Sequence, residues 1–109
     1  MVTAFAESMA LAEAVGLSQG DLQEVLALGA VANPMFTLKG PAMVAGAFPP
    51  AFPLKHQQKD LRLALALGDE ADVALPVAAA ANEVFKRAKA KGLGDADMAA
   101  VYEAVKGSK

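Results

Sequence analysis

Apolar residues recur at helical spacing from the first residue of the chain. Phe5 and Met9 lie four positions apart, and neighbouring positions continue this pattern as far as Gly16. We therefore expect a first helix over residues 1–15. A helix normally opens with a side chain that caps its first N–H groups, but here the apolar pattern is already under way at Met1. This start predicts that the chain begins inside a longer helix and is the C-terminal portion of a larger protein; the alternative is a frayed native start.

Capping and helix-breaking residues delimit the next two helices. Ser18 is expected to cap a second helix that closes at Gly29. Asn33 is expected to cap a third, weaker helix that the pair Gly40-Pro41 interrupts. The stretch 41–53 holds four of the six prolines, so we predict an irregular chain there. Because this loop is also apolar, we expect it to pack against another part of the protein.

Two longer helices are predicted in the second half of the chain. The most regular pattern covers residues 54–67, and we expect this helix to end at Gly68, which a cluster of acidic residues follows. Pro76 then opens an alanine-rich helix whose four consecutive alanines would let another helix approach closely. The basic residues of its last turns and Gly92 after them are typical of a helix end, because cations stabilise the negative end of the helix dipole.

A last helix is expected before the C-terminus. Asp95 or Gly94 can cap it, and Gly107 ends it. The composition agrees with a helical chain, because 26 Ala and 13 Leu greatly outnumber 10 Val, 2 Thr and no Ile. The sequence therefore predicts an all-α fold of about five to six helices, in a single domain over residues 1–109.

Composition and charge exclude several classes of function. A net charge of -2 argues against a dedicated nucleic-acid surface. The chain has no Cys and one His, so we expect no disulfide framework, no thiolate nucleophile and no zinc site. The longest apolar tract, residues 71–81, is far shorter than the ~20 residues of a membrane span, and the N-terminus lacks the basic region of a secretory signal. We expect a soluble protein of the cytoplasm or an organelle.

One predicted helix face changes from polar to apolar along its length. His56, Lys59, Asp60, Leu63 and Leu67 share this face at helical spacing. The apolar half is expected to face a core, so the polar half could open into a cleft where an ammonium and a carboxylate contact a ligand. An ordinary solvated face explains the same charges equally well.

Two other candidates favour structural roles. His56 has no Ser, Cys or second His near it in sequence, so a surface or hydrogen-bonded role is favoured over a catalytic one. The basic cluster over residues 86–91 could attract phosphate, but stabilisation of a helix end explains it without a partner.

The amino-acid sequence resembles that of a known family. Lys59-Asp60-Leu61 followed by Leu63-Ala64 is similar to the K-D-L-x-L-A segment of the β-hydroxyacid dehydrogenases. The match to the branch of plant and algal glyoxylate/succinic semialdehyde reductases is more specific, and it includes Gly40-Pro41, residues 51–67, Pro76 and residues 78–83. The resemblance covers essentially the whole chain.

The resemblance implies half of a two-domain enzyme. Members of the family hold NADPH in an N-terminal Rossmann domain and add an all-α domain of the 6-phosphogluconate dehydrogenase C-terminal type, which begins within a long interdomain helix. They reduce a small aldehyde, such as glyoxylate or succinic semialdehyde, to its hydroxyacid by hydride transfer from NADPH. The proton-donating Lys of the family would fall upstream of Met1, as would the Rossmann domain. We therefore expect the chain alone to be inactive.

The resemblance also implies roles for three residues. It makes Lys59 a contact of the cofactor near the nicotinamide, Phe52 a wall of the substrate pocket, and Asp60 a polar group beside the catalytic Lys and the substrate. An Asp next to a Lys stabilises the ammonium form and orients it, and a Phe between prolines offers a rigid apolar wall. A homo-oligomer is expected as well.

Two further interpretations compete with the reductase. The same family includes a nuclear, nucleosome-associated factor whose dehydrogenase-like domain lacks the catalytic Lys and serves as a scaffold. The chain could also be a helical dimerisation fragment without activity, because an uncapped helix and an alanine-rich stretch would leave an apolar face open. Phe52, Lys59 and Asp60 favour the enzyme over these alternatives.

Overall fold

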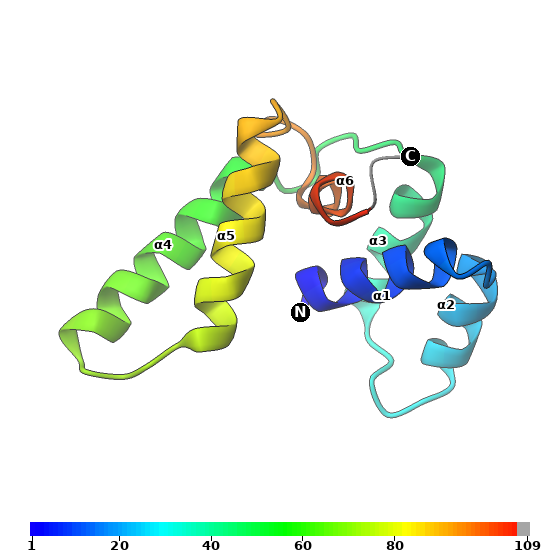
Figure 1. The fold of residues 1–109 in the computed structure, drawn as a ribbon, viewed down its shortest axis with the longest axis horizontal. Helices are drawn as coiled ribbons and strands as arrows, with labels where there is room; N and C mark the ends of the chain where they lie inside the picture. Colours follow the sequence, from blue (N-terminus) through cyan, green and yellow to red (C-terminus); the bar gives the residue numbers. More distant parts are fainter. Residues whose placement is uncertain (107–109) are drawn as a thin grey trace.

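The computed structural model describes residues 1–106, and helices account for most of them (Figure 1). In chain order the elements are α1 (Val2–Ala14), α2 (Gln19–Ala27), α3 (Pro34–Ala45), α4 (Leu54–Glu70), α5 (Pro76–Ala90), the 3-10 helix η1 (Met98–Val101) and α6 (Tyr102–Val105). The described part of the chain contains no β-strand, and its one β-type contact is an isolated bridge between Pro53 and Asp97. The predicted all-α fold is confirmed.

Local capping sets the starts of α2 and α3 as the sequence predicts. Ser18 Oγ accepts a hydrogen bond from the Asp21 N–H at 3.1 Å, and Asn33 Oδ1 accepts one from the Phe36 N–H at 3.1 Å. The start of α1 at Met1 has no side-chain cap, as its sequence indicates. These starts are determined by neighbouring residues and need no tertiary contact.

The expected break of α3 at Gly40-Pro41 is wrong, because the helix continues to Ala45. A proline inside a helix removes one backbone hydrogen bond. Tertiary packing outweighs this loss: Lys39, Gly40 and Met43 are all buried. The helix ends instead at Gly46, whose positive φ of 65° suits a left-handed helix end.

The structure also corrects the ends of two later elements. The helix α4 passes through Gly68 and ends at Glu70, and a Cβ at Gly68 would lie 2.8 Å from Leu75 Cδ1 and 3.0 Å from the Val73 carbonyl oxygen. Asp97, rather than Asp95 or Gly94, caps the last helical segment, which opens as a 3-10 helix. The predicted end at Gly107 lies outside the described residues.

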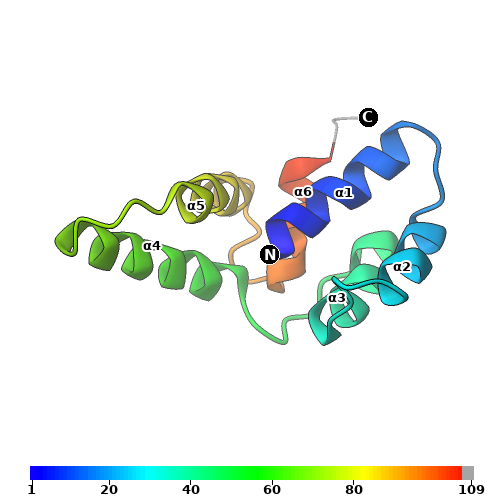
Figure 2. The same cartoon turned by 90° about the horizontal axis from the view of Figure 1, so that it is seen from below.

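The core lies where α1, α3, η1 and α6 meet. Its largest fully buried side chains are Met9, Met43, Leu54 and Val101. The two views show α4 and α5 as a hairpin whose far end lies apart from α1, α2 and α3 (Figures 1 and 2).

The outer face of this hairpin does not belong to the core. Leu63 and Leu67 are 52% and 66% exposed, so the expectation that this half of the stripe faces a core is wrong within the described chain. The opposite side of α4 makes the buried contacts instead: Gln58 bonds to α5, and Gly68 packs against the turn before α5.

Candidate functional site

Lys59 and Asp60 lie in the first two turns of α4, Phe52 lies just before the helix, and all three are open to solvent. The Lys59 Nζ lies 3.0 Å from Asp60 Oδ1, and both side chains are about half exposed. Phe52 lies two residues before the first residue of α4, Leu54, and is 37% exposed. Its ring is tilted against that of His56, with 6.2 Å between the ring centroids. Since residues four apart share a helix face, His56 links the Phe52 ring to the side of α4 that carries Asp60.

Backbone contacts with the loop before η1 mount the start of α4. The Leu54 N–H donates to the Ala96 carbonyl at 2.8 Å, and the Lys55 N–H donates to the Gly94 carbonyl at 2.9 Å. These bonds satisfy two of the N–H groups that a helix start leaves free, which explains why α4 has no capping side chain. The position of the candidate site therefore depends on Gly94 and Ala96, which lie more than 30 positions further along the chain.

A buried carboxylate fixes the segment before α4. Asp97 Oδ1 accepts hydrogen bonds from the N–H groups of Ala51 at 3.0 Å and Phe52 at 2.9 Å, and Oδ2 accepts one from the Ala99 N–H at 3.0 Å. The Lys39 ammonium contacts Oδ1 at 3.1 Å and Oδ2 at 2.9 Å. The side chains of the pair are only 6% and 4% exposed.

The surroundings of Asp97 keep its carboxylate ionised. Burial raises its pKa, but hydrogen bonds from the N–H groups of Phe52 and Ala99, from Lys39 and from the Ala51 N–H together outweigh burial, so the pKa of Asp97 lies below its ordinary value. The sequence prediction missed both members of this pair. A usable signal was present, because Lys39 is the first cation after 38 residues without Lys or Arg and falls in an apolar segment. A buried lysine requires a partner of opposite charge.

A second polar cluster joins α4 to α5. Gln58 Nε2 donates to Asn82 Oδ1 at 3.0 Å, and Lys89 Nζ donates to Gln58 Oε1 at 3.0 Å. Lys86, which like Lys89 belongs to the basic cluster over residues 86–91, pairs with Glu83 at 3.1 Å. Two basic side chains of residues 86–91 thus have partners within the chain.

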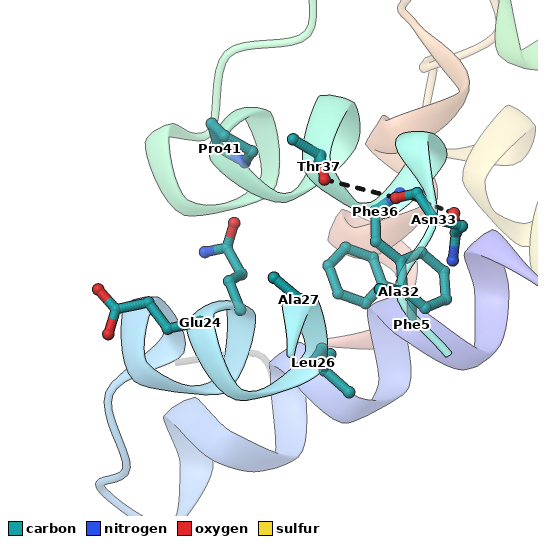
Figure 3. A pocket seen from close by; sticks show the side chains of 10 residues that line it. Phe5, Glu24, Leu26, Ala27, Ala32, Asn33, Phe36, Thr37 and Pro41 are labelled. Atoms are coloured by element: carbon teal, nitrogen blue, oxygen red, sulfur yellow. Dashed lines mark hydrogen bonds between the residues drawn. The ribbon is translucent and has the colours of Figure 1, made fainter. Parts of the chain in front are cut away.

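A largely apolar cavity lies between α1, α2 and α3, away from the candidate residues (Figure 3). Its volume is about 270 Å³. The stacked rings of Phe5 and Phe36 form one end, with 4.3 Å between their centroids, and Pro41 lies at the other end. None of Phe52, Lys59 and Asp60 lines it.

The described residues offer neither a metal centre nor a membrane span. Residues 1–106 hold no group of three or more His, Cys, Asp or Glu side chains placed to bind a metal ion. Within the same part of the chain, no helix is both long and apolar enough to cross a membrane.

The helical fold and the KDL segment in α4 agree with the helical part of the NAD(P)-dependent hydroxyacid dehydrogenases. The family described as "NAD-binding of NADP-dependent 3-hydroxyisobutyrate dehydrogenase" matches residues 1–105. The chain therefore belongs to the β-hydroxyacid dehydrogenase family. Its resemblance to this family, inferred from the sequence, is confirmed.

Two plant reductases of this family are highly similar to the chain. The chain is 62% identical over 109 residues to glyoxylate/succinic semialdehyde reductase 1 of Arabidopsis thaliana, covering 100% of this chain and 38% of that protein. It is 51% identical to the chloroplastic reductase 2 of the same plant, covering 100% of this chain and 30% of that protein. The chain thus spans about a third of the length of these reductases.

One solved structure and one group of nuclear proteins are also similar. The crystal structure of 3-hydroxyisobutyrate dehydrogenase from Salmonella typhimurium superposes with a TM-score of 0.88 at 29% identity, covering 94% of this chain and 36% of that one. The cytokine-like nuclear factor N-PAC of Mus musculus is 50% identical over 99 residues, covering 91% of this chain and 18% of that protein. Both the enzyme and the nuclear-factor interpretations therefore have relatives of high similarity.

Proposed function

We propose that this chain is the C-terminal helical domain of an NADPH-dependent reductase that converts glyoxylate or succinic semialdehyde to the hydroxyacid. The exposed group Phe52, Lys59 and Asp60 at the start of α4 is the observation that carries the proposal. In the whole protein, the Rossmann domain and the proton-donating Lys would precede Met1. This chain would supply one wall of the pocket between the two domains.

The residues present fit a nicotinamide cofactor at this place. An ammonium has three N–H donors, and the Lys59 ammonium has one described partner, Asp60, while its side chain stays 46% exposed. Lys59 can therefore donate to an oxygen of NADPH without losing its carboxylate partner. When bound, NADPH supplies the hydride that reduces the aldehyde carbon.

Phe52 and Asp60 divide the remaining tasks. The Phe52 ring offers apolar surface against the carbon chain of the aldehyde, and its backbone is held by Asp97. Asp60 orients Lys59 and places a carboxylate beside the substrate, where it would stabilise the ammonium form of the family's catalytic Lys. None of these three residues is the proton donor in the proposed reaction.

A chimera tests this proposal directly. The part of the Arabidopsis reductase 1 that this chain matches, 38% of that protein, is replaced by these 109 residues. We expect the chimera to oxidise NADPH with glyoxylate or succinic semialdehyde, whereas the isolated chain should show no turnover. A chimera that is helical, folded and binds NADPH, yet reduces neither aldehyde, would contradict the proposal.

The similarity to the nuclear factors favours one alternative, a scaffold without catalysis. This alternative is decided by the native coding sequence upstream of Met1, because the two kinds of relative are expected to differ at the catalytic Lys. A Rossmann fingerprint together with that Lys supports the reductase. A Rossmann domain without the Lys, or a stop codon directly before Met1, supports a scaffold or a dimerisation fragment.

We also propose that the chain forms homo-oligomers through the α4–α5 hairpin. Its far half, residues 63–80, carries three acidic residues and no basic ones, whereas residues 81–91 carry four basic residues and one acidic residue. Two hairpins packed antiparallel would place the acidic end of one copy against the basic end of the other. The same arrangement would bury Leu63 and Leu67, which are exposed in a single copy.

A further inference from the structure

We propose that Asp97 and Lys39 are positioning residues that fix the direction of the Phe52 ring and thereby set the width of the aldehyde pocket. The effect on the pocket rests on the function proposed above, but the positioning itself does not. Neither residue touches the proposed substrate or cofactor, so each would act through Phe52.

The backbone of Phe52 is bonded on both sides to the same short segment. Its N–H donates to Asp97 Oδ1 at 2.9 Å, and its carbonyl accepts from the Met98 N–H at 2.8 Å. The Asp97 N–H in turn donates to the Phe48 carbonyl at 3.1 Å. Because these bonds hold the peptide groups before and after the Phe52 Cα, they restrict the backbone angles from which its ring projects.

The carboxylate does more than cap η1. An N-cap needs one oxygen, and Oδ2 fills this role by accepting from the Ala99 N–H at 3.0 Å. The other oxygen, Oδ1, faces the Ala51 and Phe52 N–H groups, which belong to the segment before α4. Half of the carboxylate is therefore committed to the segment that carries Phe52.

Lys39 fills the last acceptor sites of the Asp97 carboxylate. A carboxylate offers about four lone-pair sites, and three N–H groups together with the Lys39 ammonium occupy Asp97 from both oxygens. Such a carboxylate has no capacity left for a proton shuttle or a metal ion, which favours a positioning role. Lys39 also ties the Phe52 segment to α3, because its ammonium reaches Asp97 from that helix.

Two double variants separate positioning from capping. Lys39→Met/Asp97→Asn removes both charges but keeps an amide oxygen that can accept from Ala51 and Phe52. Lys39→Met/Asp97→Ser keeps a hydroxyl that can cap η1 but is too short to serve Phe52 as well. Because neither variant leaves an unpaired buried charge, both are expected to fold.

The first experiment follows amide hydrogen exchange by NMR in this 109-residue chain. We expect the Phe52 and Ala51 amides to exchange about tenfold faster or more in the Ser variant than in the Asn variant. The Asp21 amide, which Ser18 holds in α2, should not change in either variant. Equal protection of the Phe52 amide in wild type and both variants would overturn the positioning role, whatever the activity of the whole enzyme.

The second experiment measures kinetics in the chimera. Loosening Phe52 should raise KM for succinic semialdehyde about tenfold in the Ser variant, with a smaller change in kcat, because the ring contributes to binding of its carbon chain and not to hydride transfer. The Asn variant should recover most of the wild-type KM. A loss confined to the Asn variant would indicate that only the η1 cap matters and would overturn the proposal. If the chimera carrying the wild-type chain is itself inactive, the proposed function fails, while the exchange experiment still tests the positioning.

Discussion

Replacing Lys39 by Met alone should destabilise the chain strongly, because it leaves a charged carboxylate buried. Both side chains of the Lys39–Asp97 pair are at most 6% exposed, and methionine fills a similar apolar volume without the charge. Removing one member of a buried pair typically costs about 3–5 kcal/mol. Since three backbone N–H groups still solvate Asp97, we expect the lower end, about 3 kcal/mol. The free energy of unfolding of a native protein, for comparison with this 109-residue chain, is typically about 5–15 kcal/mol.

The pH dependence of this loss follows from Asp97. The pKa of Asp97 in the folded chain lies below the ordinary value of 3.8, so its ionised form stabilises the fold above that value. This contribution disappears as pH falls through the lower folded pKa. Without Lys39 the pKa of Asp97 should rise, and the carboxyl can then take up a proton in the folded variant. The deficit of Lys39→Met relative to wild type should therefore be largest at neutral pH and smaller in acid.

Urea unfolding followed by circular dichroism, at neutral pH and in acid, measures both effects. Lys86→Met is a matched control, because Lys86 pairs with Glu83 at the surface with side chains 53% and 66% exposed; its cost should stay below about 0.5 kcal/mol. The double variant Lys39→Met/Asp97→Asn should recover most of the lost stability. A single Lys39→Met variant within about 0.5 kcal/mol of wild type at neutral pH would refute the reasoning.

Three further measurements test other parts of the structure. Leu67→Asp should lower the oligomeric state in sedimentation velocity, whereas Leu28→Asp, at a leucine that is 90% exposed elsewhere, should not; a wild-type chain that stays monomeric would contradict the proposed interface. In the chimera, Lys59→Ala should raise KM for NADPH about tenfold with a smaller change in kcat, and an unchanged KM would remove Lys59 from the cofactor site. Gly68→Ala should lower the midpoint of thermal unfolding although alanine favours helices, because the added methyl would lie 3.0 Å from the Val73 backbone carbonyl oxygen and 2.8 Å from a leucine side chain. Gly20→Ala in α2, where the nearest atom is 3.6 Å away, should raise it; equal shifts in both would exclude the packing role of Gly68.

Features of the fold that depend on neighbouring residues are predictable from the sequence. Ser18 and Asn33 cap their helices through N–H groups three residues away, so a short stretch of sequence contains the whole interaction. The KDL segment placed Lys59 and Asp60 on α4, and helical spacing put Asp60 on the same face as His56. The family could be inferred from the sequence for the same reason, because the inference rests on residue types at fixed spacing.

Features that join distant residues depend on how the whole chain packs. Pro41 lies inside α3 because the packing of Lys39 and Gly40 outweighs one lost hydrogen bond. Asp97 meets Phe52 across 45 positions of sequence, and no local pattern contains that contact. Leu67 looks like a core residue from its spacing, yet no element of the described chain packs on its face. Periodicity shows which residues share a face, whereas the partner of that face depends on how the whole chain packs.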